Sequence, residues 1–146
     1  MSQAVDFLRL HEPRLILLHM ALMKQNPANF FANLDEVESY YFSLNNIASI
    51  INFFEDDRKM LEAAYASFYL YMKRGATFED FNELIKSFVK SFEADIRSLL
   101  PDEPELAEQI IERFAQQRRV YVKTFGDVVA KLDPTETNKP PEINQQ

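Results

Sequence analysis

The sequence contains no cysteine and no tryptophan, and it has only two glycines and two histidines among 146 residues. Without cysteine there can be no thiol nucleophile, zinc ribbon, iron–sulfur cluster or disulfide framework. Two glycines cannot build a glycine-rich phosphate-binding loop. Because an absence of cysteine is typical of proteins from a reducing compartment, we expect a cytoplasmic location.

Long hydrophobic runs are also missing. The longest strongly apolar stretch covers residues 15–23 and is interrupted by His19, whereas a membrane span needs about 18–20 apolar residues. Asp6, Arg9 and Glu12 stand where the apolar region of a signal peptide would run. The sequence therefore predicts a soluble protein with no membrane insertion.

Charge of one sign dominates, because 23 acidic residues against 16 basic ones give a net charge of −7. Phosphate contacts govern nucleic-acid affinity, so an acidic domain without a basic face is a poor nucleic-acid binder. The one local basic cluster, interrupted by Glu108 and Glu112, is Arg113, Arg118, Arg119 and Lys123. We interpret this cluster as a solvated helix face and expect no nucleic-acid partner.

What the sequence does contain is helical spacing of apolar residues throughout, with no sustained period-two alternation. This pattern predicts an all-α bundle of about five to six helices, of which the last two are long. Residues 1–132 are expected to form the domain. Residues 133–146, with three prolines and mostly polar residues, are expected to be a disordered tail or linker.

Helix boundaries are predicted by capping residues and prolines. Pro13 should either kink the first helix, residues 2–24, or restart it at a new first turn. Asn33 is expected to cap the second helix, with Glu36 completing a capping box. Residues 55–57 are expected to end that helix and cap the third, and Gly75 should take the left-handed position after it. The fourth helix should begin at Thr77 and stop before Pro101, and a fifth should begin near Pro104.

No catalytic, metal-binding or cofactor-binding constellation emerges from the pattern. His11 and His19 are eight residues apart with a proline between them, which is not a metal-ligand spacing. Most carboxylates cluster at expected helix starts, where the helix dipole already accounts for them. We therefore predict a non-enzymatic protein without metal or cofactor.

The unusual feature is the aromatic content of 13 phenylalanines and six tyrosines. Most of these rings are expected to fill the core, but a buried tyrosine needs a partner for its hydroxyl. An apolar pocket with a few polar groups suits a small apolar ligand. The residues predicted to line such a pocket are His19, Tyr40, Tyr41, Tyr65, Phe68, Tyr71 and Met72.

Apolar residues also lie off the main stripes of the last two helices. Such residues often mark a surface for a partner helix. The sequence therefore predicts a homodimer with Phe78, Val89, Val120 and Val122 in its interface.

In helix order and lengths, residues 5–132 resemble the N-terminal non-heme globin domains of the stressosome protein RsbR and related bacterial sensor modules. Two segments carry the resemblance: MKRGATFEDFNELIKSFVKSF at residues 72–92 and ELAEQIIERFAQQRRVYVKTF at residues 105–125. The resemblance implies a globin-like fold without heme that dimerises through its last two helices. It also implies a stress-signalling function exerted on a protein partner or an attached output domain, such as a STAS domain or a kinase.

Two other classes of function stay open. One is a helical interaction protein without a ligand, of an anti-regulator or immunity type, whose acidic surface steers it to a basic partner. The other is a heme-based gas sensor. A histidine-ligated heme would need a histidine at about residues 58–74, and no histidine follows His19. The C-terminal tail, where the family continues as a helix, leaves open whether the chain is a truncated sensor or a free-standing homologue.

Overall fold

The computed structural model describes residues 2–132, and within that range every regular element is helical, which confirms the all-α prediction. The predicted tail, residues 133–146, lies outside the described residues. The elements are α1 (Ser2–Leu10), α2 (Glu12–Met23), the 3₁₀ helix η1 (Phe30–Asn33), α3 (Glu36–Glu55), α4 (Asp57–Lys73), α5 (Phe78–Leu99) and α6 (Pro104–Leu132).

Pro13 restarts the first helix rather than kinking it. The backbone of His11 leaves the helical conformation between α1 and α2, and the proline occupies the first turn of α2. Proline is tolerated there because the amide that it lacks would have no partner within the helix. The single helix expected over residues 2–24 is therefore two helices.

The segment between α2 and α3 is held by side chains of α5. The Nδ2 group of Asn26 donates to both carboxylate oxygens of Glu83, at 3.0 and 2.9 Å, and the Nδ2 group of Asn29 donates to Glu83 Oε1 at 2.8 Å. The backbone amide of Phe30 donates to Asp80 Oδ1 at 3.0 Å. These bonds fix the segment against the beginning of α5.

The predicted start of α3 at Asn33 is wrong. Asp35 caps this helix, and its carboxylate accepts from the backbone amide of Glu38 at 2.8 Å. The side-chain amide of Asn33 instead donates to the carbonyl of Asn29 at 3.2 Å, within the 3₁₀ turn. The sequence pattern could not reveal that this turn precedes the helix.

The other predicted boundaries are confirmed. Asp56 caps α4 by accepting from the amide of Arg58 at 2.9 Å. Gly75 follows α4 with a φ of 111°, which side chains with a Cβ rarely adopt. Thr77 and Asp80 form a reciprocal capping box at the start of α5. The helix ends at Leu99, before Pro101.

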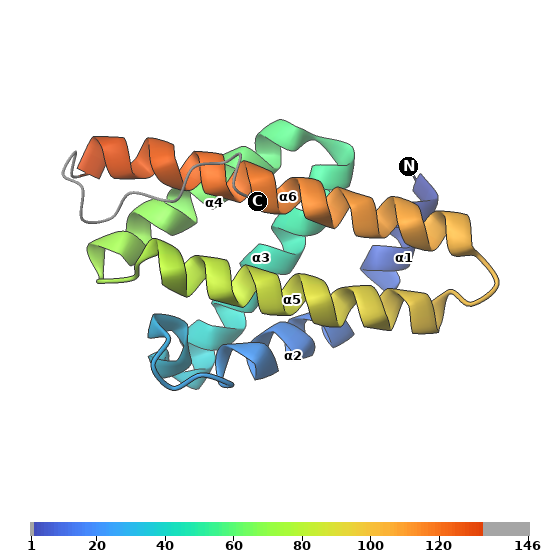
Figure 1. Cartoon of the computed structure of the whole chain (residues 1–146), viewed down its shortest axis with the longest axis horizontal. Coiled ribbons are helices and arrows are strands. Elements are labelled where there is room, and N and C mark those ends of the chain that lie inside the picture. The colour runs from blue at the N-terminus through green and yellow to red at the C-terminus, as the bar shows by residue number, and fades with distance from the viewer. Residues whose placement is uncertain (1, 133–146) are drawn as a thin grey trace.

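The two long helices α5 and α6 lie side by side across one face of the bundle (Figure 1). Helix α2 packs on α5, α4 packs on α6, and α3 runs behind the pair and contacts α1, α2, α4 and α6. Of the helices among residues 2–132, none is long and apolar enough to cross a membrane.

Aromatic rings fill much of the interior, as expected from the composition. Phe31 stacks on Phe42 with ring centroids 4.5 Å apart, and Phe92 packs on Phe114 at 3.8 Å. Edge-to-face contacts also join α4 to α5. One of them is between Phe68 and Phe81, whose ring centroids are 4.5 Å apart. Such contacts add a modest stabilisation to the burial of the rings themselves.

Candidate functional site

A groove with a volume of about 400 Å³ lies between α3 and α4 and has both polar and apolar lining residues. The helices are antiparallel and are joined only by Asp56, and an ion pair between Glu38 and Arg74 bridges them at the far end. Their facing turns carry small side chains, which leave space between the helices. The lining residues are Phe42, Asn45, Asn46, Ala48, Ser49, Asn52, Ala63, Ala64, Ala66, Ser67, Leu70, Tyr71 and Tyr121.

The chemistry of the groove is neutral, since none of its described lining residues carries a charge. Asn45 and Asn52 lie two turns apart on α3, about 10 Å along the helix axis. Each carboxamide offers a donor and an acceptor. The alanines and Leu70 supply apolar surface between them. The groove therefore suits an uncharged molecule that has both hydrogen-bonding edges and apolar faces.

A chain of buried hydrogen bonds connects the floor of the groove to α6. The Nε2 group of Gln117 donates to the hydroxyl of Tyr121 at 3.2 Å, and that hydroxyl donates to Asn46 Oδ1 at 3.4 Å. The Nδ2 group of Asn46 in turn donates to the carbonyl of Phe42 at 2.8 Å. Burial raises the pKa of Tyr121 to about 12, so the phenol keeps its proton at neutral pH.

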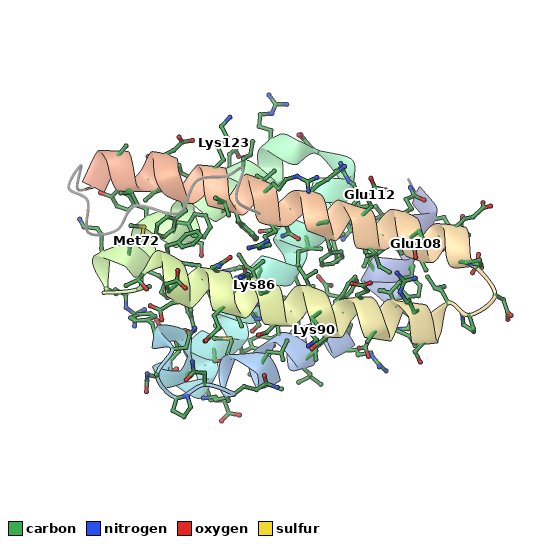
Figure 2. The ribbon with its side chains drawn as sticks, viewed as in Figure 1. Met72, Lys86, Lys90, Glu108, Glu112 and Lys123 are labelled. Carbon is green, nitrogen blue, oxygen red and sulfur yellow. The ribbon has the colours of Figure 1, made fainter. Side chains whose placement is uncertain are left out.

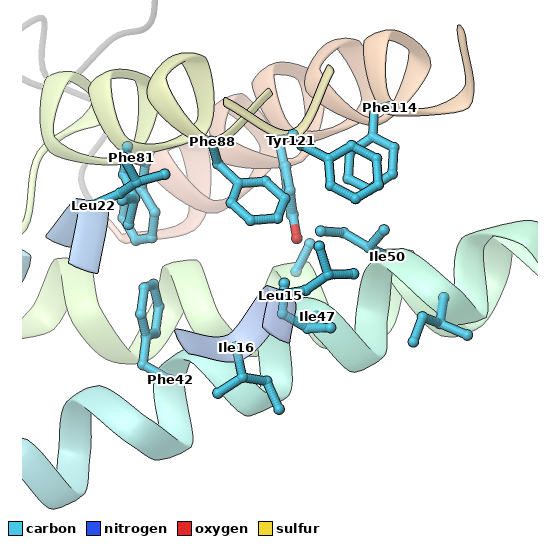
Figure 3. Close-up of a cluster of buried hydrophobic side chains, with 14 of the residues drawn as sticks. Leu15, Ile16, Leu22, Phe42, Ile47, Ile50, Phe81, Phe88, Phe114 and Tyr121 are labelled. Carbon is cyan, nitrogen blue, oxygen red and sulfur yellow. The ribbon is translucent and has the colours of Figure 1, made fainter. Parts of the chain in front are cut away.

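Figure 3 shows the setting of this tyrosine in the core. Its ring lies beside Phe88 and Phe114, and its hydroxyl points toward Ile47 and Ile50 of α3. The hydrogen bond from this hydroxyl to Asn46 joins α6 to the middle of α3, while the bond from Gln117 lies within α6.

A second, small hollow of about 20 Å³ is lined by residues of the same hydrogen-bond chain. Its polar lining comes from His19, Asn46, Gln117 and Tyr121. A space of this size and polarity holds about one water molecule. Asn46 and Tyr121 line both this cavity and the α3–α4 groove, so they form the partition between the groove and the core.

His19 is a core histidine that is only 4% exposed. Its Nδ1 atom shares a hydrogen bond of 2.7 Å with the hydroxyl of Ser43, and its ring lies between Phe42 and Phe88, with centroids 5.7 and 5.4 Å away. Burial lowers the pKa of His19 to about 3, so the imidazole is neutral at physiological pH. No group of three or more potential metal-ligating side chains occurs within residues 2–132.

The seven residues predicted to line one pocket are not brought together. Tyr40 and Tyr41 are 42% and 56% exposed, and their rings contact each other at 5.4 Å on the surface of α3. Phe68, Tyr65 and Met72 pack against the core. Of the seven, Tyr71 lines the groove and His19 lines the small hollow.

Asparagine and serine side chains of the groove were missed by sequence reasoning, which followed the aromatic residues. The signal was present: Asn45, Ser49 and Asn52 recur on one side of α3, next to its apolar stripe. Ala63 and Ser67 recur with the same spacing on α4. Only the pairing of the two helices shows that these small and polar positions face each other.

The residues predicted for a dimer interface divide into two kinds. Phe78 and Val122 are 6% and 4% exposed, and the ring of Phe78 packs on Phe125 at 5.1 Å. Val89 and Val120 are half-buried against the core. The expectation that Phe78 and Val122 lie off the buried face is wrong, because contacts between α5 and α6 of a single chain cover both side chains.

No protein-family model matches the chain, and searches of curated proteins and of solved structures yield no match to it.

Proposed function

We propose that the protein is a non-catalytic regulatory module that binds a small uncharged molecule in the α3–α4 groove and transmits occupancy through α6. The observation that carries this proposal is the position of Asn46 and Tyr121, which line the groove and also join α3 to α6. A ligand at this site reaches the hydrogen bond between Tyr121 and Asn46, which joins the two helices.

The proposed mechanism is a competition for hydrogen bonds. The bond between the Tyr121 hydroxyl and Asn46 Oδ1 is long, at 3.4 Å. A ligand amide that binds Asn46 replaces this weak bond with a stronger one and frees the hydroxyl. Its differential affinity for the two arrangements then shifts the placement of α6 relative to α3. A protein partner or an attached output domain would respond to that shift.

The resemblance to the non-heme globin domains of RsbR belongs to the same proposal. A globin-like module without heme, acting in cytoplasmic stress signalling as a homodimer, would use a neutral ligand site and a long C-terminal helix in this way. The groove supports a different ligand position from the aromatic pocket expected at first, and a ligand with amide-like edges rather than a purely apolar one.

Native mass spectrometry and ligand-observed NMR test the ligand. Benzamide and nicotinamide are suitable probes because both are neutral, planar carboxamides. Ala66→Phe places a phenyl ring in the groove, whereas Ala94→Phe makes the same change at an exposed position on α5. We expect the wild-type chain and A94F to bind a probe or retain a co-purifying small molecule, and A66F to bind neither. Equal behaviour of the two variants, or no binding by the wild-type chain, would refute the ligand site.

The second candidate is a helical interaction protein that needs no ligand. Leu10 of α1 and Leu17 of α2 favour it, because they are large apolar side chains that are 75% and 66% exposed. Exposed apolar side chains suit a partner surface. A pull-down with the Leu17→Glu and Ala66→Phe variants distinguishes the two functions. If L17E loses a stoichiometric partner that A66F retains, the interaction function is favoured over the regulatory one.

A further inference from the structure

Helix α6 exposes a row of five residues on its outer side, which we name the α6 stripe: Glu108, Glu112, Ala115, Arg119 and Lys123. All five are exposed, and spacings of four, three, four and four residues keep them on one face of the helix. Glu108, Glu112 and Lys123 of the stripe are labelled on α6 in Figure 2. None of the five lines the α3–α4 groove.

The charges of the stripe are arranged symmetrically about its small residue. Two acids precede Ala115 and two cations follow it. Glu112 and Arg119 are equally far from the point between residues 115 and 116, and so are Glu108 and Lys123. If a second α6 is laid antiparallel on the first about that point, every acid faces a cation.

We propose that a second copy of the chain docks on the α6 stripe, with the two α6 helices antiparallel and crossing at Ala115. Each Glu112 then faces Arg119 of the other copy, and each Glu108 faces Lys123 of the other copy. Ala115 presents only a methyl group at the crossing point, so the helices can approach closely there. The interface uses charged surface and differs from the apolar one expected at first. It is independent of the proposed ligand.

Three of the four charged groups of the stripe are available for such contacts. Within residues 2–132, Glu112, Arg119 and Lys123 take part in no ion pair, while Glu108 pairs with Arg97. Elsewhere the arginines at positions 14, 58 and 74 each have an acidic partner in the chain. The cations of the stripe are thus left unpaired in a chain of net charge −7.

Helix α5 adds to the complementarity. Lys86 and Lys90 lie alongside the middle of α6, and both are exposed (Figure 2). In the antiparallel arrangement Glu112 of the second copy arrives near these two lysines as well as Arg119. The basic cluster identified from the sequence contained only residues of α6, because Lys86 and Lys90 belong to α5.

The dimer is expected to be weak and sensitive to salt. An exposed ion pair changes a dissociation constant by about onefold to fivefold, so four such pairs contribute on the order of thirtyfold. Charges in water are screened over about 10 Å at 0.1 M salt and about 3 Å at 1 M. The fraction of dimer should therefore fall steeply as NaCl is raised over this range.

Sedimentation equilibrium of the full chain tests the proposal through charge reversal. Glu112→Lys and Arg119→Glu each place like charges opposite one another, and each should weaken the dimer by on the order of thirtyfold. Two combinations restore opposite charges: an equimolar mixture of the E112K and R119E chains, and a single chain that carries both substitutions. Both should dimerise more strongly at low salt than either single variant alone, and more weakly than the wild-type chain because residue 112 is then a lysine near Lys86 and Lys90.

Glu62→Lys and Lys24→Glu are the matched controls, since both positions are exposed and lie away from the stripe. They make the same changes in net charge and should leave dimerisation unchanged. Circular dichroism checks that every variant is folded, and recovery in the mixture cannot come from unfolding. A wild-type chain that is monomeric at low salt, or a mixture that stays monomeric, would overturn the proposal.

Discussion

Removing the hydroxyl of Tyr121 tests the buried link between α3 and α6. Tyr121 is 6% exposed, and its hydroxyl accepts from Gln117 at 3.2 Å and donates to Asn46 at 3.4 Å. Tyr121→Phe leaves the ring in place but deprives both partners of a hydrogen bond. Gln117 is 4% exposed, so its buried amide loses the Tyr121 hydroxyl as a hydrogen-bond partner, whereas Asn46 also faces the groove, where water can reach it.

These contacts set the expected magnitude. An unsatisfied buried donor costs about 1–3 kcal/mol, and both hydrogen bonds are longer than usual, so we expect Y121F to lower the free energy of unfolding by about 1–2 kcal/mol. Replacing both groups with apolar ones of similar shape is nearly neutral. A chain with Gln117→Met and Tyr121→Phe together should therefore be more stable than Y121F alone.

Urea unfolding of the wild-type chain, both single variants and the double variant gives the four free energies of a double-mutant cycle. The reasoning is refuted if Y121F is as stable as the wild-type chain. It is also refuted if the double variant loses the sum of the two single losses, because the side chains would then not be coupled.

Three further predictions concern single residues. Burial lowers the pKa of His19 in the folded state to about 3, well below the value of 6.5 for an exposed histidine, so protonation favours unfolding. The free energy of unfolding should therefore fall from pH 6.5 to pH 5, by up to about 1.4 kcal/mol per pH unit. In urea unfolding at each pH, His19→Gln should flatten this slope. Gly75→Ala should lower the free energy of unfolding by about 1 kcal/mol through the φ of 111° alone, because a Cβ at this position meets no atom within 4 Å; Gly75→Asn, which tolerates a positive φ, should cost less. Glu83→Ala should lower the thermal midpoint, with a loss of about 1–2 kcal/mol, because Asn26 loses its carboxylate acceptor and Asn29 keeps only the carbonyl of Asp80.

The fold could be predicted from the sequence wherever a residue acts on its own neighbours in the chain. Gly75, Thr77 and Pro101 determine local backbone geometry, and the boundaries that they indicate are those of the structure. The start of α3 was misplaced because Asn29 and Asp35 depend on the 3₁₀ turn between them. That turn is held partly by side chains of α5, more than 40 residues away.

The candidate site was less predictable because it depends on the pairing of helices. Tyr40 and Tyr41 satisfy the same sequence pattern as Tyr71, yet they lie on the solvent side of α3, while Tyr71 lies on the buried side of α4. Periodicity assigns residues to faces of a helix but does not identify the neighbouring helix. The asparagines and serines that line the groove carried no apolar signal.

The length of α6 determines the geometry of a pair built on the α6 stripe. Leu132 lies about 16 residues beyond the crossing point, or about 25 Å at 1.5 Å per residue. In an antiparallel pair the two C-terminal ends of α6 are therefore about 50 Å apart, at opposite poles of the assembly. Domains attached beyond those ends would extend outward in opposite directions and could not meet in a parallel coiled coil. A protein built in this way would bring together two separate partners rather than join two copies of one output domain.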